Sequence, residues 1–204
     1  MGALLSNFRN TMIVSFVLAL VMVYAFGSAA GFDARFGQAL LRWAHLFFGI
    51  LWIGLLYYFN FVQIRKMPEI PNELKPGVSK YIAVEALFWF RWAALATVVA
   101  GVLLAFARGM AYVSEVFSFG FAGGYTAADR GFTLMGIGIY LALIMFFNVW
   151  GVIWPNQKIA LGLVEADADA KAKAGRTAML FSRTNTLLSL PMLTAMGMYQ
   201  TLFG

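Results

Sequence analysis

The amino-acid sequence predicts an all-α membrane protein: a polytopic bundle of about five transmembrane helices, forming a single integral membrane domain over residues 1–204. The chain is 62% hydrophobic and only 12% charged, whereas soluble domains are about 45–50% apolar and about 25% charged. A globule of 204 residues cannot bury this apolar excess, so lipid must cover it. The 20 Phe, 8 Tyr and 6 Trp also suit a protein with aromatic belts at the two membrane surfaces.

Five stretches are long enough to cross a hydrocarbon core of about 30 Å, which takes about 20 apolar residues in a helix. The predicted spans cover residues 11–30, 40–62, 83–107, 132–154 and 178–202. The first span follows Arg9 and ends in small residues, as a signal peptide does, but its length favours a retained helix. The fifth is the least regular, because Arg183, Asn185 and Pro191 interrupt it.

Basic residues are concentrated on one side of this predicted topology. With five spans, the N-terminus and the second and fourth loops share that side. They carry nine Lys and Arg residues: Arg9, Arg65, Lys66, Lys75, Lys80, Lys158, Lys171, Lys173 and Arg176. The positive-inside rule therefore predicts a cytoplasmic N-terminus and a periplasmic C-terminus.

The fourth loop predicts a cytoplasmic helix over about residues 158–176. Its acidic residues come first and its basic residues last, which complements the helix dipole. The third loop, on the other side, is rich in aromatic residues and Gly, and we expect it to lie along the membrane surface or against a partner. The net charge of +6 is spread over the loops rather than gathered on one face, so nucleic acid is not an expected partner.

The chain contains no Cys and one His. It therefore supplies no disulfide, no zinc–cysteine site, no iron–sulfur ligation and no attachment site for a c-type haem. A metal site built from several His residues is excluded in the same way. No nucleophile with its base and no phosphate-binding loop stands out, so the sequence assigns no catalytic residue and predicts no metal.

Polar residues inside the predicted spans face the bundle interior, because they are costly in lipid, and they often mark function. The topology predicts a polar cluster in the inner leaflet, formed by Asn60, Glu85, Arg91, Asn148, Arg183 and Asn185. One interpretation is structural: these groups satisfy one another across helices, or Glu85 and Arg183 reach water from the interface. The other interpretation is a cavity for a quinone headgroup, a proton path or a small anion.

His45 is predicted to lie apart, in the outer leaflet. On a helix it shares a face with Gly49 and Trp52, and Gly49 removes bulk one turn away. These three residues could bind a flat group such as haem b or quinone. A haem would need a Met, an open position or another subunit's His as its second ligand. The alternative is a hydrogen bond from His45 to a neighbouring helix.

Two segments resemble the N-terminal family of bacterial membrane urate oxidases. The first is LLRWAHLFFGILWIGLLYYFNF, with Arg42, Trp43, His45, Trp52, Ile53 and Gly54, and the second is FFNVWGVIWPNQKIALG at residues 146–162. The resemblance implies a helical membrane domain from about residue 38 onward, in a bacterial inner membrane. Full-length members resemble such a domain followed by a cytochrome c domain, whereas this sequence has no Cys-x-x-Cys-His motif.

Two functions are compatible with these features. The first is an accessory subunit of a larger membrane oxidoreductase or respiratory-type electron-transport complex, without catalytic activity of its own. Its partners are then the lipid bilayer and other membrane subunits. The alternative is a haem- or quinone-binding oxidoreductase or electron carrier that uses His45 and the inner polar cluster.

Overall fold

All regular structure in the computed structural model, which describes residues 2–203, is helical. After the short α1 (Gly2–Leu5), four helices are apolar and long enough to cross a membrane: Phe8–Ala30, Ala34–Glu69, Lys75–Ala107 and Arg130–Ala160. A fifth long helix, α10 (Ala168–Leu202), is more polar and follows them. Each of the five predicted spans lies within one of these helices, and the chain is a small membrane protein.

Three of the four apolar helices are composite. The second consists of α3 (Ala34–Tyr57), the π-helix η1 (Tyr58–Gln63), α4 (Ile64–Lys66) and the 3₁₀ turn η2 (Met67–Glu69). The third consists of α5 (Lys75–Gly77), the π-helix η3 (Val78–Ala83) and α6 (Val84–Ala107). The fourth consists of α8 (Arg130–Phe147), the π-helix η5 (Asn148–Ile153) and α9 (Trp154–Ala160). Such π-helical turns are rare and are frequent at functional sites.

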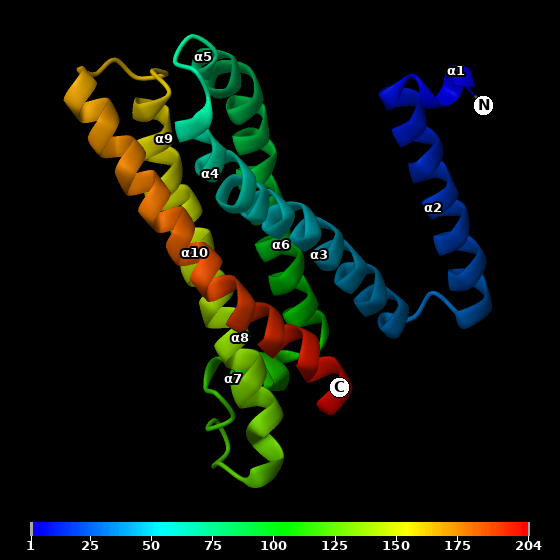
Figure 1. The fold of residues 1–204 in the computed structure, drawn as a ribbon. Coiled ribbons are helices and arrows are strands. Elements are labelled where there is room, and N and C mark those ends of the chain that lie inside the picture. Colours follow the sequence, from blue (N-terminus) through cyan, green and yellow to red (C-terminus); the bar gives the residue numbers. More distant parts are fainter. Residues whose placement is uncertain (1, 204) are drawn as a thin grey trace.

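The bundle is built from two helix pairs. α3 packs along α6, and α10 packs along α8, η5 and α9 in turn, so α10 follows the fourth apolar helix over its length (Figure 1). Contacts of α10 with α3 and of α6 with α8 join the pairs. The core between them is apolar and includes Trp52, Leu56, Phe90, Met145 and Val149.

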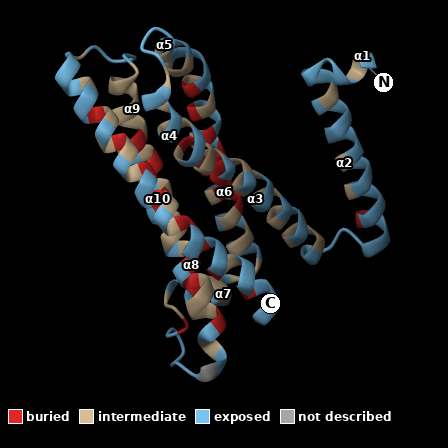
Figure 2. Cartoon of the chain, viewed as in Figure 1, coloured by how far each residue is buried: buried red, intermediate tan, exposed pale blue. Residues whose placement is uncertain are grey.

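α2 (Phe8–Ala30) stands apart from this bundle. Its one buried residue is Gly27, which lies under the rings of Phe32 and Phe36 just past the helix end. Figure 2 shows the buried positions on the inner sides of α6, α8 and α10, whereas α2 is exposed over nearly its whole length.

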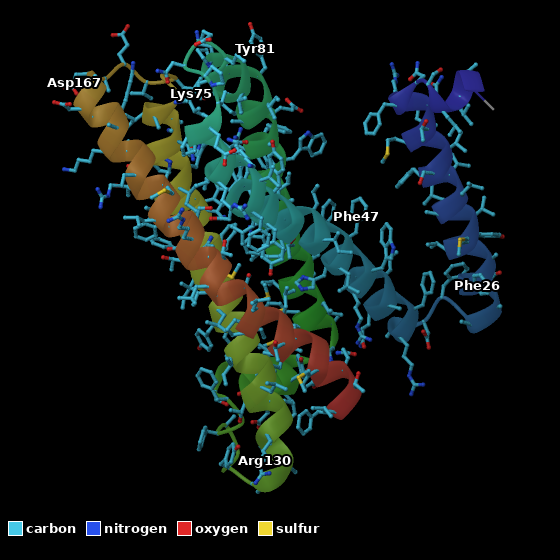
Figure 3. The ribbon with its side chains drawn as sticks, viewed as in Figure 1. Phe26, Phe47, Lys75, Tyr81, Arg130 and Asp167 are labelled. Atoms are coloured by element: carbon cyan, nitrogen blue, oxygen red, sulfur yellow. The ribbon has the colours of Figure 1, made fainter. Side chains whose placement is uncertain are left out.

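The connections alternate between the two ends of the bundle. Lys75 and Asp167 lie at one end and Arg130 at the other (Figure 3). At the Arg130 end, α7 (Met110–Phe117) packs on α8, and the short 3₁₀ turn η4 (Ala127–Asp129) leads into α8.

The predicted separate helix over residues 158–176 is wrong. α9 ends at Ala160, and Gly162 takes a left-handed conformation with φ of +74°, which a residue with a Cβ adopts only under strain. The side chain of Asp167 then accepts a hydrogen bond from the Ala170 N–H at 2.7 Å and caps α10. The acidic residues therefore start the last long helix, which continues through Pro191.

Candidate functional site

His45 forms a hydrogen bond between α3 and α6. Its Nδ1 lies 2.8 Å from the backbone carbonyl oxygen of Thr97. Because a carbonyl only accepts, Nδ1 carries the hydrogen, and in the neutral ring Nε2 keeps its lone pair. α6 has a glycine where the ring lies: a Cβ on Gly101 would be 2.9 Å from His45 Nδ1. The structure thus places His45 in a close helix–helix contact.

Gly49 and Trp52 belong to the same contact. A Cβ on Gly49 would lie 3.7 Å from Thr97 Cγ2, so α6 already covers this glycine. Trp52 is 1% exposed, and its Nε1 has no hydrogen-bond partner among the described residues. A porphyrin needs an open planar slot beside its axial ligand, and here α6 fills that space. These residues do not fit a haem.

A second polar region joins α10 to η5. Asn148 Nδ2 donates to Asn185 Oδ1 at 2.8 Å, and Asn185 Nδ2 donates to the Met145 carbonyl at 2.9 Å. Asn185 is fully buried and Asn148 is 5% exposed. Amide pairs of this kind hold membrane helices together, because lipid offers them no other partner.

The third amide, Asn60 on η1, reaches the same face of α10. Its Nδ2 donates to the Leu56 carbonyl at 2.9 Å and to Ser182 Oγ at 2.8 Å. One turn earlier on α3, the Tyr57 hydroxyl lies 2.9 Å from Ser189 Oγ. Together these polar groups form the amide seam, which consists of Tyr57, Asn60, Asn148, Ser182, Asn185 and Ser189.

Two side-chain oxygens of η1, one in the amide seam and one beside it, have no hydrogen-bond donor. Asn60 Oδ1 and Gln63 Oε1 are buried and receive no hydrogen bond from the described residues. A buried oxygen without a donor costs about 1–3 kcal/mol, so these two atoms are favourable positions for a donor from outside the chain.

The charged members of the predicted inner cluster lie outside the amide seam. Glu85 is exposed and accepts a hydrogen bond from Trp89 Nε1 at 2.9 Å. Arg183 is exposed on α10. The Arg91 guanidinium lies 3.9 Å from the ring centre of Trp154. Long charged side chains can lie along aromatic rings near a membrane surface and need no interior partner.

Sequence reasoning missed Tyr57, Ser182 and Ser189. The last two lie three residues before and four residues after Asn185, on one helix face, and this spacing is the signal that could have found them. Among residues 2–203, no group of three or more His, Asp or Glu side chains is placed to hold a metal ion.

Comparison with known protein families identifies a match in the second half of the chain. Residues 105–202 match the family described as urate oxidase N-terminal, which confirms the resemblance over just under half of the chain, including the segment 146–162. His45 and its helix lie before the matched region. No curated protein and no solved structure matches the chain.

Proposed function

We propose that this chain, which matches the urate oxidase N-terminal family over residues 105–202, is an accessory subunit of a larger membrane oxidoreductase complex and has no catalytic activity of its own. The observation that carries the proposal is α2. This helix is apolar on all sides, buries only Gly27 and stands outside its own bundle.

An isolated spanning helix is a natural contact for another membrane subunit. Hydrophobicity does not drive helices together in lipid, so α2 gains nothing from folding back on its own bundle unless the shapes fit. Its exposed side chains include Leu18 and Met22, at 59% and 61% exposed. A partner helix that fits this surface gains van der Waals contacts that lipid supplies less well.

The interior supports a non-catalytic role. The buried amides of the amide seam mostly satisfy one another, and His45 is engaged by Thr97. No described pair of side chains resembles a nucleophile with its base.

The topology that accompanies this function has five crossings in a bacterial inner membrane. The fourth apolar helix, Arg130–Ala160, has 31 residues at about 1.5 Å each, so it is longer than a hydrocarbon core of about 30 Å. α10 follows it over its length, so α10 crosses where that helix crosses. The basic residues of the N-terminus and of the second and fourth loops favour a cytoplasmic N-terminus and a periplasmic C-terminus.

Native gel migration in mild detergent tests the role. We expect the chain to co-migrate with a complex that reduces or oxidises a redox dye. The substitutions Leu18→Ala and Met22→Ala on α2 should release it. Leu187→Ala and Leu190→Ala remove exposed leucines from α10, at 73% and 65% exposed, and should leave the complex intact. Migration as a single chain, or equal release by both pairs, contradicts the proposal.

A second candidate function rests on Asn60 Oδ1 and Gln63 Oε1. A membrane quinol carries two O–H donors, which match two buried oxygens that lack donors. If the chain binds quinol there, a soluble quinol analogue should raise its melting temperature, and Asn60→Leu should abolish the rise. An equal rise in both proteins, or none in either, removes this candidate.

A further inference from the structure

Three side chains from different parts of the chain lie together at the end of the bundle that contains α7: Arg108 just after α6, Tyr112 on α7 and Tyr199 near the end of α10. Arg42 on α3 belongs to the same end of the bundle. The Arg108 guanidinium lies 4.3 Å from the ring centre of Tyr112 and 5.6 Å from that of Tyr199. Both arginines act electrostatically on Tyr112.

The backbone around this group is fixed. Gln38 Nε2 donates to the Ala107 carbonyl at 2.8 Å, which ties the start of α3 to the end of α6. Tyr199 is only 3% exposed. The two arginines are therefore carried by helices that cannot separate freely, although both side chains remain partly accessible.

Neither arginine has an anionic partner in the part of the chain that the structure describes. The ion pair found there is Lys66–Glu69, and among residues 2–203 no carboxylate forms an ion pair with Arg42 or Arg108. Asp33 and Asp129, the acids of the nearby turns, accept from the N–H groups of Phe36 and Thr126. The Arg108 guanidinium, with the positive charge of Arg42 acting on the same tyrosine, therefore offers a site for an anion.

The chemistry of the group favours phosphate. Stacking on Tyr112 uses the face of the Arg108 guanidinium and leaves its N–H edge free for the forked contact that phosphate accepts. Burial, the largest cause, raises the pKa of Tyr112, and the arginines only partly oppose it. Its hydroxyl therefore stays protonated at neutral pH. Because it is hydrogen-bonded to Tyr199, the two tyrosines together offer an O–H group to a phosphate oxygen.

The position of the group matches the depth of lipid headgroups. Arg108 follows Ala107, the last residue of an apolar helix long enough to cross the membrane, so its charge lies where the hydrocarbon ends. A cavity of about 110 Å³ adjoins Tyr199 and is lined by Ala128, Gly131, Phe132 and Phe203 as well. It offers room next to Tyr199 for a part of the lipid beyond the phosphate.

We propose that Arg42, Arg108, Tyr112 and Tyr199 bind the phosphate of an anionic phospholipid. The site lies within a single chain and does not depend on the partner subunit proposed above. The same chemistry could be met by free phosphate, and the experiment below separates the two sources.

Native mass spectrometry of the delipidated full chain tests the site, with phosphatidylglycerol, phosphatidylcholine or inorganic phosphate added back in detergent. We expect one phosphatidylglycerol to be retained in preference to phosphatidylcholine. Arg42→Gln with Arg108→Gln should weaken this binding at least about tenfold, because charge-assisted hydrogen bonds are lost. Arg35→Gln with Arg130→Gln changes the charge equally, at exposed positions of the same end, and should bind as the unmodified chain does.

Tyr112→Phe provides a second test that keeps the ring beneath Arg108. It should weaken binding about three- to tenfold through loss of the hydroxyl, and it decides the question if the double arginine variant does not fold. Displacement of phosphatidylglycerol by millimolar phosphate supports the site and makes free phosphate an alternative occupant. Equal retention of both lipids, or equal losses in the test and control pairs, overturns the proposal.

Discussion

α2 and α10 are both long helices of one membrane protein. The more apolar of the two is the less buried, which is the reverse of what is found among the helices of a soluble protein. α2 has the highest mean hydropathy of the four apolar helices and buries one residue. α10 is too polar to join those four and buries eight residues. In lipid, an apolar side chain needs no protein neighbour, whereas a small or polar one gains from close packing and hydrogen bonds.

The buried residues of α10 follow a helical stripe: Ala174, Ala178, Ser182, Asn185, Ser189, Met192, Ala195 and Tyr199. Most of them are small, which lets α8, η5 and α9 approach closely. The amide seam lies within this stripe. Specific pairing between helices is therefore concentrated in α10, and α2 remains available for contacts outside the chain.

Among substitutions that test this difference between α10 and α2, Asn185→Leu is expected to have the largest effect on stability. The substitution leaves Asn148 Nδ2 without its acceptor in the buried interior, and it removes the side-chain donor to the Met145 carbonyl. We expect a loss of about 2 kcal/mol in the free energy of unfolding, measured by circular dichroism of the purified protein in detergent. Val21→Ala on α2, where the side chain is 58% exposed, should change it by less than about 0.5 kcal/mol.

A companion variant separates the hydrogen bonds from the shape of the site. Replacing both Asn148 and Asn185 by Leu removes donor and acceptor together, so it should recover part of the loss caused by Asn185→Leu alone. If the double variant is as unstable as the sum of the two single variants, the Asn148–Asn185 hydrogen bond is not what joins these helices.

Gly101→Ala is expected to have the next largest effect, because it acts on the other helix pair. The added Cβ would lie 2.9 Å from His45 Nδ1 and push the ring away from the Thr97 carbonyl. Losing this hydrogen bond should cost about 1 kcal/mol in thermal unfolding. Gly197→Ala on α10 is the matched control, because a Cβ there meets nothing within 4 Å. Equal melting temperatures for the two variants would show that the α3–α6 contact is looser than described.

The sequence predicts which segments form long helices, but it does not predict which faces of those helices pair with one another. The existence of the long apolar helices follows from runs of apolar residues, because a bilayer demands such length. The pairing of Asn148 with Asn185 does not follow, because two residues 37 positions apart meet only once the register of two helices is set. For the same reason the sequence could not tell that Asn60 would find Ser182.

The placement of charged side chains and the positions of helix ends were also difficult to predict from the sequence. For Glu85 and Arg183 the sequence left two interpretations open, a partner inside the bundle or a charge that reaches water from the interface, because a long side chain can satisfy its charge at the surface of the bundle. The predicted helix at 158–176 failed because its charge order is equally favourable for a helix that starts at Asp167. In this region α9 ends near Gly162, which has a left-handed conformation. The amino-acid composition of the segment does not predict that conformation.

Ser182→Ala tests the contribution of a single hydrogen bond within the amide seam. It removes one of the two acceptors of Asn60 Nδ2, while the Leu56 carbonyl remains 2.9 Å away. A single hydrogen bond between membrane helices contributes about 0.6 kcal/mol on average, so a loss of this size is expected in thermal unfolding. Ser15→Ala on the exposed α2 should have no measurable effect.

The smallest effects are expected for the exposed charges. Arg183→Gln and Glu85→Gln alter side chains that lie outside the amide seam, so each should change the free energy of unfolding by no more than about 0.5 kcal/mol. Arg183 is two residues from Asn185 along α10 but points to another side of the helix, which makes the pair a sensitive comparison. A loss for Arg183→Gln as large as that for Asn185→Leu would mean that the guanidinium has a buried partner, and that polarity on α10 is not confined to one face.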